Sequence, residues 1–166
     1  MKPFYYFICA AVSLSLAFTS CDKEEDNENS EKTVLEGKWV HSERTDYDNN
    51  NYMDRAESFT FNGNKFILES SETGVSRGEW GYGHKLTGTF TCTESSFTIK
   101  VEKFYSFNND DKQFDWHEYE EPSVGKSYTF RYEIEEGHSL GVTAPEEFAL
   151  GGGSYLGEGQ VWYAKE

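Results

Sequence analysis

Apolar and polar residues alternate at every second position over most of the chain after Val34. In residues 128–135, for example, large apolar side chains alternate with threonine, arginine and glutamate. This period is typical of strands that bury one face, and no stretch of ten residues after Val34 has convincing helical spacing. The pattern predicts strands near residues 35–40, 58–62, 66–68, 80–82, 86–93, 97–102, 128–135, 140–142 and 161–163.

Short strands at this spacing, joined by turns such as residues 62–64, are typical of an antiparallel barrel or sandwich. We therefore predict an all-β fold, a single antiparallel up-and-down β-barrel of about eight strands formed by residues 33–166. Two long connections, at residues 106–126 and 144–159, interrupt the alternation. Closing the sheet would leave no long exposed edge, and its interior would be either filled by side chains or open to a small ligand.

The first twenty residues form a separate unit, with a short basic start and an almost wholly apolar stretch at residues 4–16. This layout is typical of a secretory signal because the apolar stretch is short for a bilayer-spanning helix; a transmembrane anchor is the alternative. Residues 18–21, Phe-Thr-Ser-Cys, resemble the lipobox of bacterial lipoproteins. The resemblance implies that Cys21 takes a diacylglyceryl group and becomes the first residue of the mature chain.

Residues 22–32 carry six acids, two lysines and no apolar residue. Such a segment cannot bury enough surface to offset its ordering entropy, so we predict a disordered acidic tether at residues 21–32. Its start, Asp-Lys-Glu-Glu-Asp, resembles the signal that sends lipoproteins of one group of diderm bacteria to the outer surface; the alternative is a solvated spacer. Together these features predict an outer-membrane lipoprotein, exposed at the cell surface and anchored through Cys21.

Charge and cysteine content narrow the function further. The 166 residues include 30 Asp+Glu against 15 Lys+Arg, a formal net charge of −15, which argues against nucleic-acid binding. Of the three cysteines, Cys9 lies in the signal and Cys21 at the lipid site, which leaves only Cys92 in the domain and predicts no intrachain disulfide. The domain must be stabilised by its core, for which its many aromatic residues are suited.

The first predicted strand carries a family resemblance. Its sequence Leu-Glu-Gly-Lys-Trp, with Gly37 and Trp39, is similar to the Gly-x-Trp signature of lipocalins. Residues 57–66 and 77–82 resemble repeated patterns of small bacterial lipocalin-like lipoproteins. The resemblance implies a barrel closed at one end by Gly37 and Trp39; the alternative is that Trp39 is an ordinary core residue. The chain has no arginine after Arg131 to pack over the tryptophan, and Lys165 is the weaker substitute.

Residues 46–57 follow the spacing of a calcium-binding loop, with oxygen-bearing side chains at positions 1, 3, 5, 9 and 12. Position 6 is an asparagine where glycine is standard, and the flanks have strand rather than helix patterns. The alternative is a polar hairpin whose carboxylates face water. The calcium hypothesis, which is the only cofactor predicted, assigns the metal to Asp46, Asp48, Asn50, Asp54 and Glu57.

An acidic, aromatic run at residues 110–121 is the second candidate site. Aromatic rings beside carboxylates would suit stacking on a sugar ring. The alternative, which the alternation favours, is a strand whose rings close the core. The candidate ligand-binding residues are Phe114, Trp116 and Tyr119.

The sequence contains no motif for nucleophilic catalysis or phosphate binding, which favours a non-enzymatic function. We predict a lipocalin-like binding domain for a small apolar molecule, a glycan or a protein partner. The alternative is a protein-interaction module, such as an inhibitor or adhesin, that uses its acidic loops. Four histidines are scattered without the spacing of zinc ligands: His41, His84, His117 and His138.

Overall fold

The computed structural model describes residues 33–48, 51–74, 80–108, 115–148, 150, 156 and 159–166. The predicted signal, the lipidation site at Cys21 and the tether lie outside these residues. Within them, no helix is long and apolar enough to cross a membrane. The strands of the described part are β1 (Gly37–Asp48), β2 (Asn51–Asn62), β3 (Lys65–Gly74), β4 (Trp80–Cys92), β5 (Ser96–Asn108), β6 (His117–Tyr119), β7 (Ser127–Glu135), β8 (Ser139–Thr143) and β9 (Gln160–Lys165).

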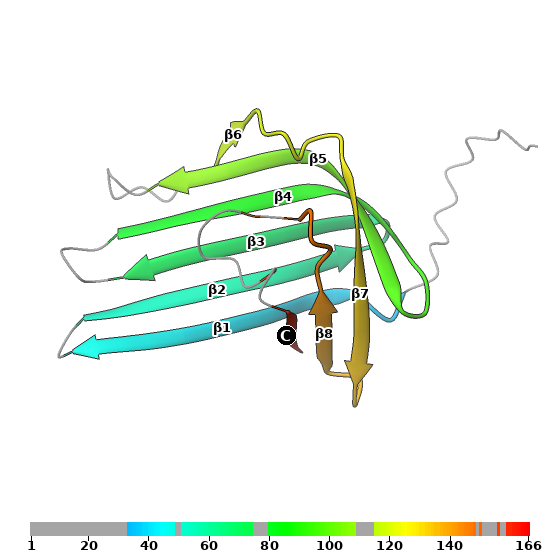
Figure 1. Ribbon diagram of the computed structural model, residues 1–166, viewed down its shortest axis with the longest axis horizontal. Coiled ribbons are helices and arrows are strands. Elements are labelled where there is room, and N and C mark those ends of the chain that lie inside the picture. The colour runs from blue at the N-terminus through cyan, green and yellow to red at the C-terminus, as the bar shows by residue number, and fades with distance from the viewer. Residues whose placement is uncertain are drawn as a thin grey trace, which may run out of the picture.

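The strands form one closed antiparallel sheet (Figure 1). β1 to β5 pair in chain order, β7 pairs with β5, β8 with β7 and β9 with β8. β9 then pairs with β1, which closes an eight-stranded barrel. The short β6 pairs with β5 outside this ring. The predicted fold class, an all-β up-and-down barrel of about eight strands, is confirmed.

The prediction of separate strands at residues 80–82 and 86–93 was wrong, because β4 runs unbroken through Gly83. A side chain at Gly83 would meet the Phe107 ring at 2.4 Å and the carbonyl oxygen of Ser70 at 2.8 Å. The glycine is needed because the Phe107 ring lies directly against β4 at this position. Glycine therefore marks close packing here rather than the end of a strand.

Large side chains fill the centre of the barrel. The Phe59 ring makes edge-to-face contacts with Phe97, Phe130 and Tyr163, at centroid distances of 5.6, 6.0 and 5.4 Å. Aromatic rings bury large areas and stabilise a core without disulfides. The centre thus leaves no wide calyx, and its largest fully buried side chains are Trp39, Tyr163, Phe59, Phe61, Phe66, Phe97 and Phe130.

Trp39 lies fully buried near the start of β1, where the signature residues come together. Its indole Nε1–H donates to the Leu35 carbonyl oxygen at 2.7 Å. The Lys165 Nζ lies 4.8 Å from the centroid of the Trp39 ring, so the lysine takes the position over the indole that the resemblance leaves without an arginine. Gly37 has a φ of +117°, and a side chain there would lie 3.2 Å from Lys165 Cε.

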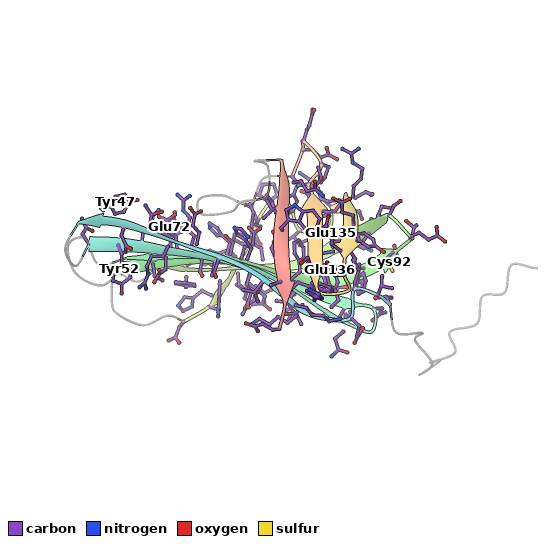
Figure 2. All side chains as sticks on the ribbon, turned by 90° about the horizontal axis from the view of Figure 1, so that it is seen from below. Tyr47, Tyr52, Glu72, Cys92, Glu135 and Glu136 are labelled. Carbon is purple, nitrogen blue, oxygen red and sulfur yellow. The ribbon has the colours of Figure 1, made fainter. Side chains whose placement is uncertain are left out.

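Five strands continue well beyond the barrel as a projecting sheet, here defined as residues 41–48, 51–57, 70–74, 80–84 and 104–108. β9 pairs with β1 only at Trp39 and Val40, so the rest of β1 extends past it (Figure 1). Figure 2 shows Tyr47 and Glu72 on one side of this sheet and Tyr52 on the other. The side with Glu72 continues the inner face of the barrel, because Glu72 shares the parity of the core residue Leu68 on β3.

Candidate functional site

A cavity of about 180 Å³ lies where the β6–β7 and β8–β9 connections meet the barrel. Its walls come from β4, β5, the start of β7 and these two connections. The lining residues are His84, Leu86, Phe104, Glu121, Ser123, Tyr128, Phe148 and Leu150.

The β8–β9 connection is held against the barrel by its apolar side chains. The connection begins with a turn in which the Phe148 N–H donates to the Pro145 carbonyl oxygen at 3.0 Å. The Phe148 ring then lies 5.0 Å from the centroids of both Tyr128 and Phe130, in edge-to-face contacts. Phe148 and Leu150 are both buried. The connection therefore forms an apolar wall of the cavity.

The opposite wall is a turn between β6 and β7. The Val124 N–H donates to the Glu121 carbonyl oxygen at 2.9 Å, and Gly125 has a φ of +84°. The Gly125 N–H donates to the Val101 carbonyl oxygen of β5 at 2.8 Å. This left-handed conformation is one that glycine adopts readily. The turn is thereby fixed to β5, and it places the Glu121 and Ser123 side chains at the cavity.

Two polar atoms in the cavity wall are buried without a partner. Neither His84 Nδ1 nor Ser123 Oγ has a hydrogen bond within the described part of the chain. Burial lowers the pKa of His84, and the negative charge of Glu121 offsets part of that effect. The imidazole is therefore mainly neutral at pH 7. Buried polar atoms in native proteins nearly always have partners, so an unsatisfied pair facing one cavity indicates a ligand or ordered water there.

His84 belongs to a row of polar residues that crosses the sheet on its inner face. Each residue of the row is the direct cross-strand partner of the next, from β1 to β6. The neighbouring row toward the barrel contains Trp39, Phe59 and Leu68 and is apolar. The polar row therefore marks where the core ends and the projecting sheet begins. Its members are His41, Glu57, Ser70, His84, Ser106 and His117.

Glu57 is the buried acid of this row, with an exposure of 1%. The Tyr163 hydroxyl donates a short hydrogen bond to its carboxylate. Burial, together with the nearby Glu57, raises the pKa of Tyr163 well above its ordinary value. Farther out on the same face, Arg55 Nε forms an ion pair with Glu72 at 2.9 Å. These interactions stabilise polar and charged groups that are buried on the inner face next to the apolar core.

Of the predicted calcium residues, those whose side chains the structure describes, Asp46, Asp54 and Glu57, do not share one face. Residues 46–48 and 51–57 belong to two paired strands, so successive side chains point to opposite faces. Asp54 lies on the outer face, where Arg44 donates two hydrogen bonds to it at 2.6 and 2.7 Å and lowers its pKa. Glu57 faces inward. Asp46 is on the face of Asp54, Asp48 ends β1, and Asn50 lies outside the described residues.

Across the described ranges, no three His, Cys, Asp or Glu side chains are grouped to hold a metal ion.

The predicted aromatic platform is also divided. Trp116 packs edge-to-face on Phe107 at 4.7 Å, and the Lys85 Nζ lies 4.3 Å from its ring centroid. Trp116 and Phe107 line a groove of about 330 Å³ on the outer face. Tyr119, in contrast, pairs with Phe104 and lies on the inner face, with an exposure of 53%. Phe114 lies outside the described residues. Trp116 and Tyr119 thus lie on opposite faces, and the sugar-stacking hypothesis stays a prediction.

The cavity residues were not predicted as a site. In the sequence His84 is one of four scattered histidines, and Glu121 and Ser123 lie in or beside an acidic segment with several other glutamates. Only the pairing of β4 with β5 and the fixed turn before β7 bring them to one cavity. A useful signal would have been the apolar Phe148 and Leu150 inside a long connection.

Comparisons with known proteins add no family assignment: no protein-family model matches the chain, and no curated protein matches it.

Proposed function

We propose that the protein is a lipid-anchored binding protein whose cavity at the β6–β7 and β8–β9 connections takes a small ligand without catalysing a reaction. The observation that carries this proposal is the pair of buried, unpartnered atoms, His84 Nδ1 and Ser123 Oγ, in a cavity with aromatic walls. An apolar pocket with a few convergent polar groups is the usual form of a small-molecule site.

The filled core limits the kind of ligand. Phe59, Phe97 and Phe130 occupy the barrel centre, so a long acyl chain has no space along the barrel axis. The cavity has a volume of about 180 Å³. This size suits a small compact molecule. The lipocalin-like signature at Gly37 and Trp39 supports a ligand-binding barrel, with its site at one end rather than in a central calyx.

The binding test compares two neighbouring substitutions in the β6–β7 turn. Ser123→Phe should fill the cavity, whereas Val124→Phe adds the same ring at an exposed position that does not line it. Native mass spectrometry of the purified protein should show a co-purifying small molecule in the wild type and in Val124→Phe. The molecule should be lost from Ser123→Phe. Equal retention in both variants, with both folded by circular dichroism, would contradict the site.

We further propose that Cys21 carries the lipid and that the domain is displayed at the cell surface. The support is the lipobox-like sequence before Cys21 and the acidic residues after it. Cells fed an alkyne-labelled palmitate should label the wild type and not Cys21→Ser, because the thiol is the acceptor. Protease added to intact cells should digest the wild-type domain if it faces outward. Labelling of Cys21→Ser would overturn the anchor.

A further inference from the structure

We propose that the cavity binds a small organic cation, with an ammonium group on a compact apolar or aromatic body. This inference rests on the proposed function and names the chemistry of its ligand. It is carried by three features of the cavity wall as the described residues form it: one carboxylate with no lysine or arginine in the wall, two polar atoms without hydrogen-bond partners, and three aromatic rings from separate elements.

The charge of the wall selects the sign of the ligand. Among the described residues, Glu121 is the only acid that lines the cavity, and no lysine or arginine lines it. None of the ion pairs found among the described residues involves Glu121. A buried or half-buried carboxylate is costly unless a positive group accompanies it. An anionic ligand would meet this carboxylate directly, whereas a cation would compensate it.

The surroundings extend the same preference. Glu120 precedes Glu121 in the chain. Glu146 and Glu147, in the β8–β9 connection, immediately precede the cavity residue Phe148. Residues 1–32 contain 3 of the 15 basic residues and 6 of the 30 acids, which leaves 12 against 24 in residues 33–166. The domain therefore has a net charge of −12. Such a field raises the local concentration of cations at the cavity and lowers that of anions.

The polar atoms match the donors of an ammonium group. A primary ammonium donates up to three hydrogen bonds and accepts none. The wall offers the Glu121 carboxylate, the Ser123 hydroxyl oxygen and, when Nε2 carries the proton, His84 Nδ1 as acceptors. A hydrocarbon would leave the last two atoms unsatisfied. The neutral state of His84 matters here because a protonated imidazole would repel the cation.

The remaining wall suits the body of such a ligand. Phe104 from β5, Tyr128 from β7 and Phe148 from the β8–β9 connection present rings to one small space. Aromatic faces attract cations, and the attraction is stronger where water is excluded. The same rings can also contact an aromatic or aliphatic body. At about 180 Å³ the cavity suits a single-ring amine and is too small for a long-chain lipid.

The test uses three probes of similar size and different charge: 2-phenylethylamine, 2-phenylethanol and 3-phenylpropanoate. Isothermal titration calorimetry at pH 7.5 should give the amine at least about tenfold tighter binding than either of the others, the scale expected for a charge-assisted hydrogen bond. Glu121→Gln should remove that preference. Glu120→Gln, which deletes the same charge one residue away and outside the cavity wall, should change amine binding by less than about threefold.

The outcomes separate this inference from the proposed function. One outcome is that the alcohol or the carboxylate binds as tightly as the amine, with Ser123→Phe abolishing that binding. In that case the cavity is a ligand site, and the inference that its ligand is a cation is wrong. Unchanged amine binding in Glu121→Gln would also contradict the inference that the ligand is a cation. If none of the probes binds, the cation inference fails. If, in addition, Ser123→Phe retains whatever co-purifies with the wild type, the proposed function fails with it.

Discussion

At the scale of single residues, the inner face combines buried polar groups that have partners with others that have none. Glu57 is fully buried and accepts a hydrogen bond from the Tyr163 hydroxyl. Two cross-strand steps away in the same row, His84 has an imidazole nitrogen with no partner among the described residues. A structural polar group is expected to be satisfied within the protein, and a binding group is not. The Ser70 hydroxyl, between these two residues, also has no partner within the described residues, but of this row only His84 lines the cavity, so the site is placed at His84.

The lowered pKa of His84 predicts how the stability of the fold depends on pH. Its folded-state pKa lies below the ordinary value of 6.5, so the unfolded chain binds the proton more strongly. The contribution of the neutral His84 to the free energy of unfolding is therefore fully present above pH 6.5. It is lost as the pH falls below that value, because the unfolded chain takes up the proton first. Glu121 is the charged group identified as acting on the imidazole, and it limits the loss.

Urea unfolding measured from pH 7.5 to pH 5 should therefore show a smaller acid-induced loss of stability in His84→Gln than in the wild type. His117→Gln, a substitution at an exposed position of β6, should follow the wild-type pH profile. A profile for His84→Gln that runs parallel to the wild type would contradict the burial of this imidazole.

At the scale of elements, the strands of the barrel could be predicted because each buries one face. β7 shows this alternation over its whole length, and its predicted bounds match the structure within one residue. β1 beyond His41 and β2 before Glu57 could not be predicted. Both of their faces lie outside the barrel core and carry polar residues, such as Arg44 and Asp54 on one face. Without an apolar face the period-two signal is lost, and the pairing is evident only in three dimensions.

The β4–β5 pair contains a close backbone approach at Gly88. The register shifts between Thr87 and Gly88, opposite Glu102. A side chain at Gly88 would lie 2.0 Å from the Lys100 carbonyl oxygen and 3.0 Å from the Glu102 amide nitrogen. Both atoms are backbone, so relief requires the strands to separate at the bulge. Gly88 is therefore required by close approach.

We expect Gly88→Ala to lower the free energy of unfolding by about 1–3 kcal/mol, the range of overpacking in a close-packed structure. Thr89→Ala, at the next and half-buried position of β4, should cost less than the glycine substitution. Thermal unfolding followed by circular dichroism measures both. Equal or higher stability of Gly88→Ala would show that the bulge relaxes without cost, because alanine by itself reduces the entropy of the unfolded chain.

At the scale of the whole molecule, the chain divides into a filled barrel and a projecting sheet with different burial along the same strands. β2 shows the change most clearly: residues 51–56 are half-buried, and Glu57, Ser58 and Phe59 are buried. β7, β8 and β9 cover the barrel half of these strands. They do not extend over the projecting sheet, because β9 pairs with β1 only at Trp39 and Val40. Local stability follows the apolar contacts that must open, so it should fall along each strand away from the barrel.

Native-state hydrogen exchange followed by NMR tests this gradient within one strand. β2 pairs with β1 and β3 along nearly its whole length, so its two halves have similar hydrogen bonding. Amides of residues 52–56 should nevertheless exchange at least about tenfold faster than those of residues 58–61, because the projecting half can open without exposing the aromatic core. Uniform exchange along β2 would mean that the projecting sheet opens only with global unfolding. In that case the sheet and the barrel would be a single cooperative unit, and the polar row would mark a change of composition without a change of stability.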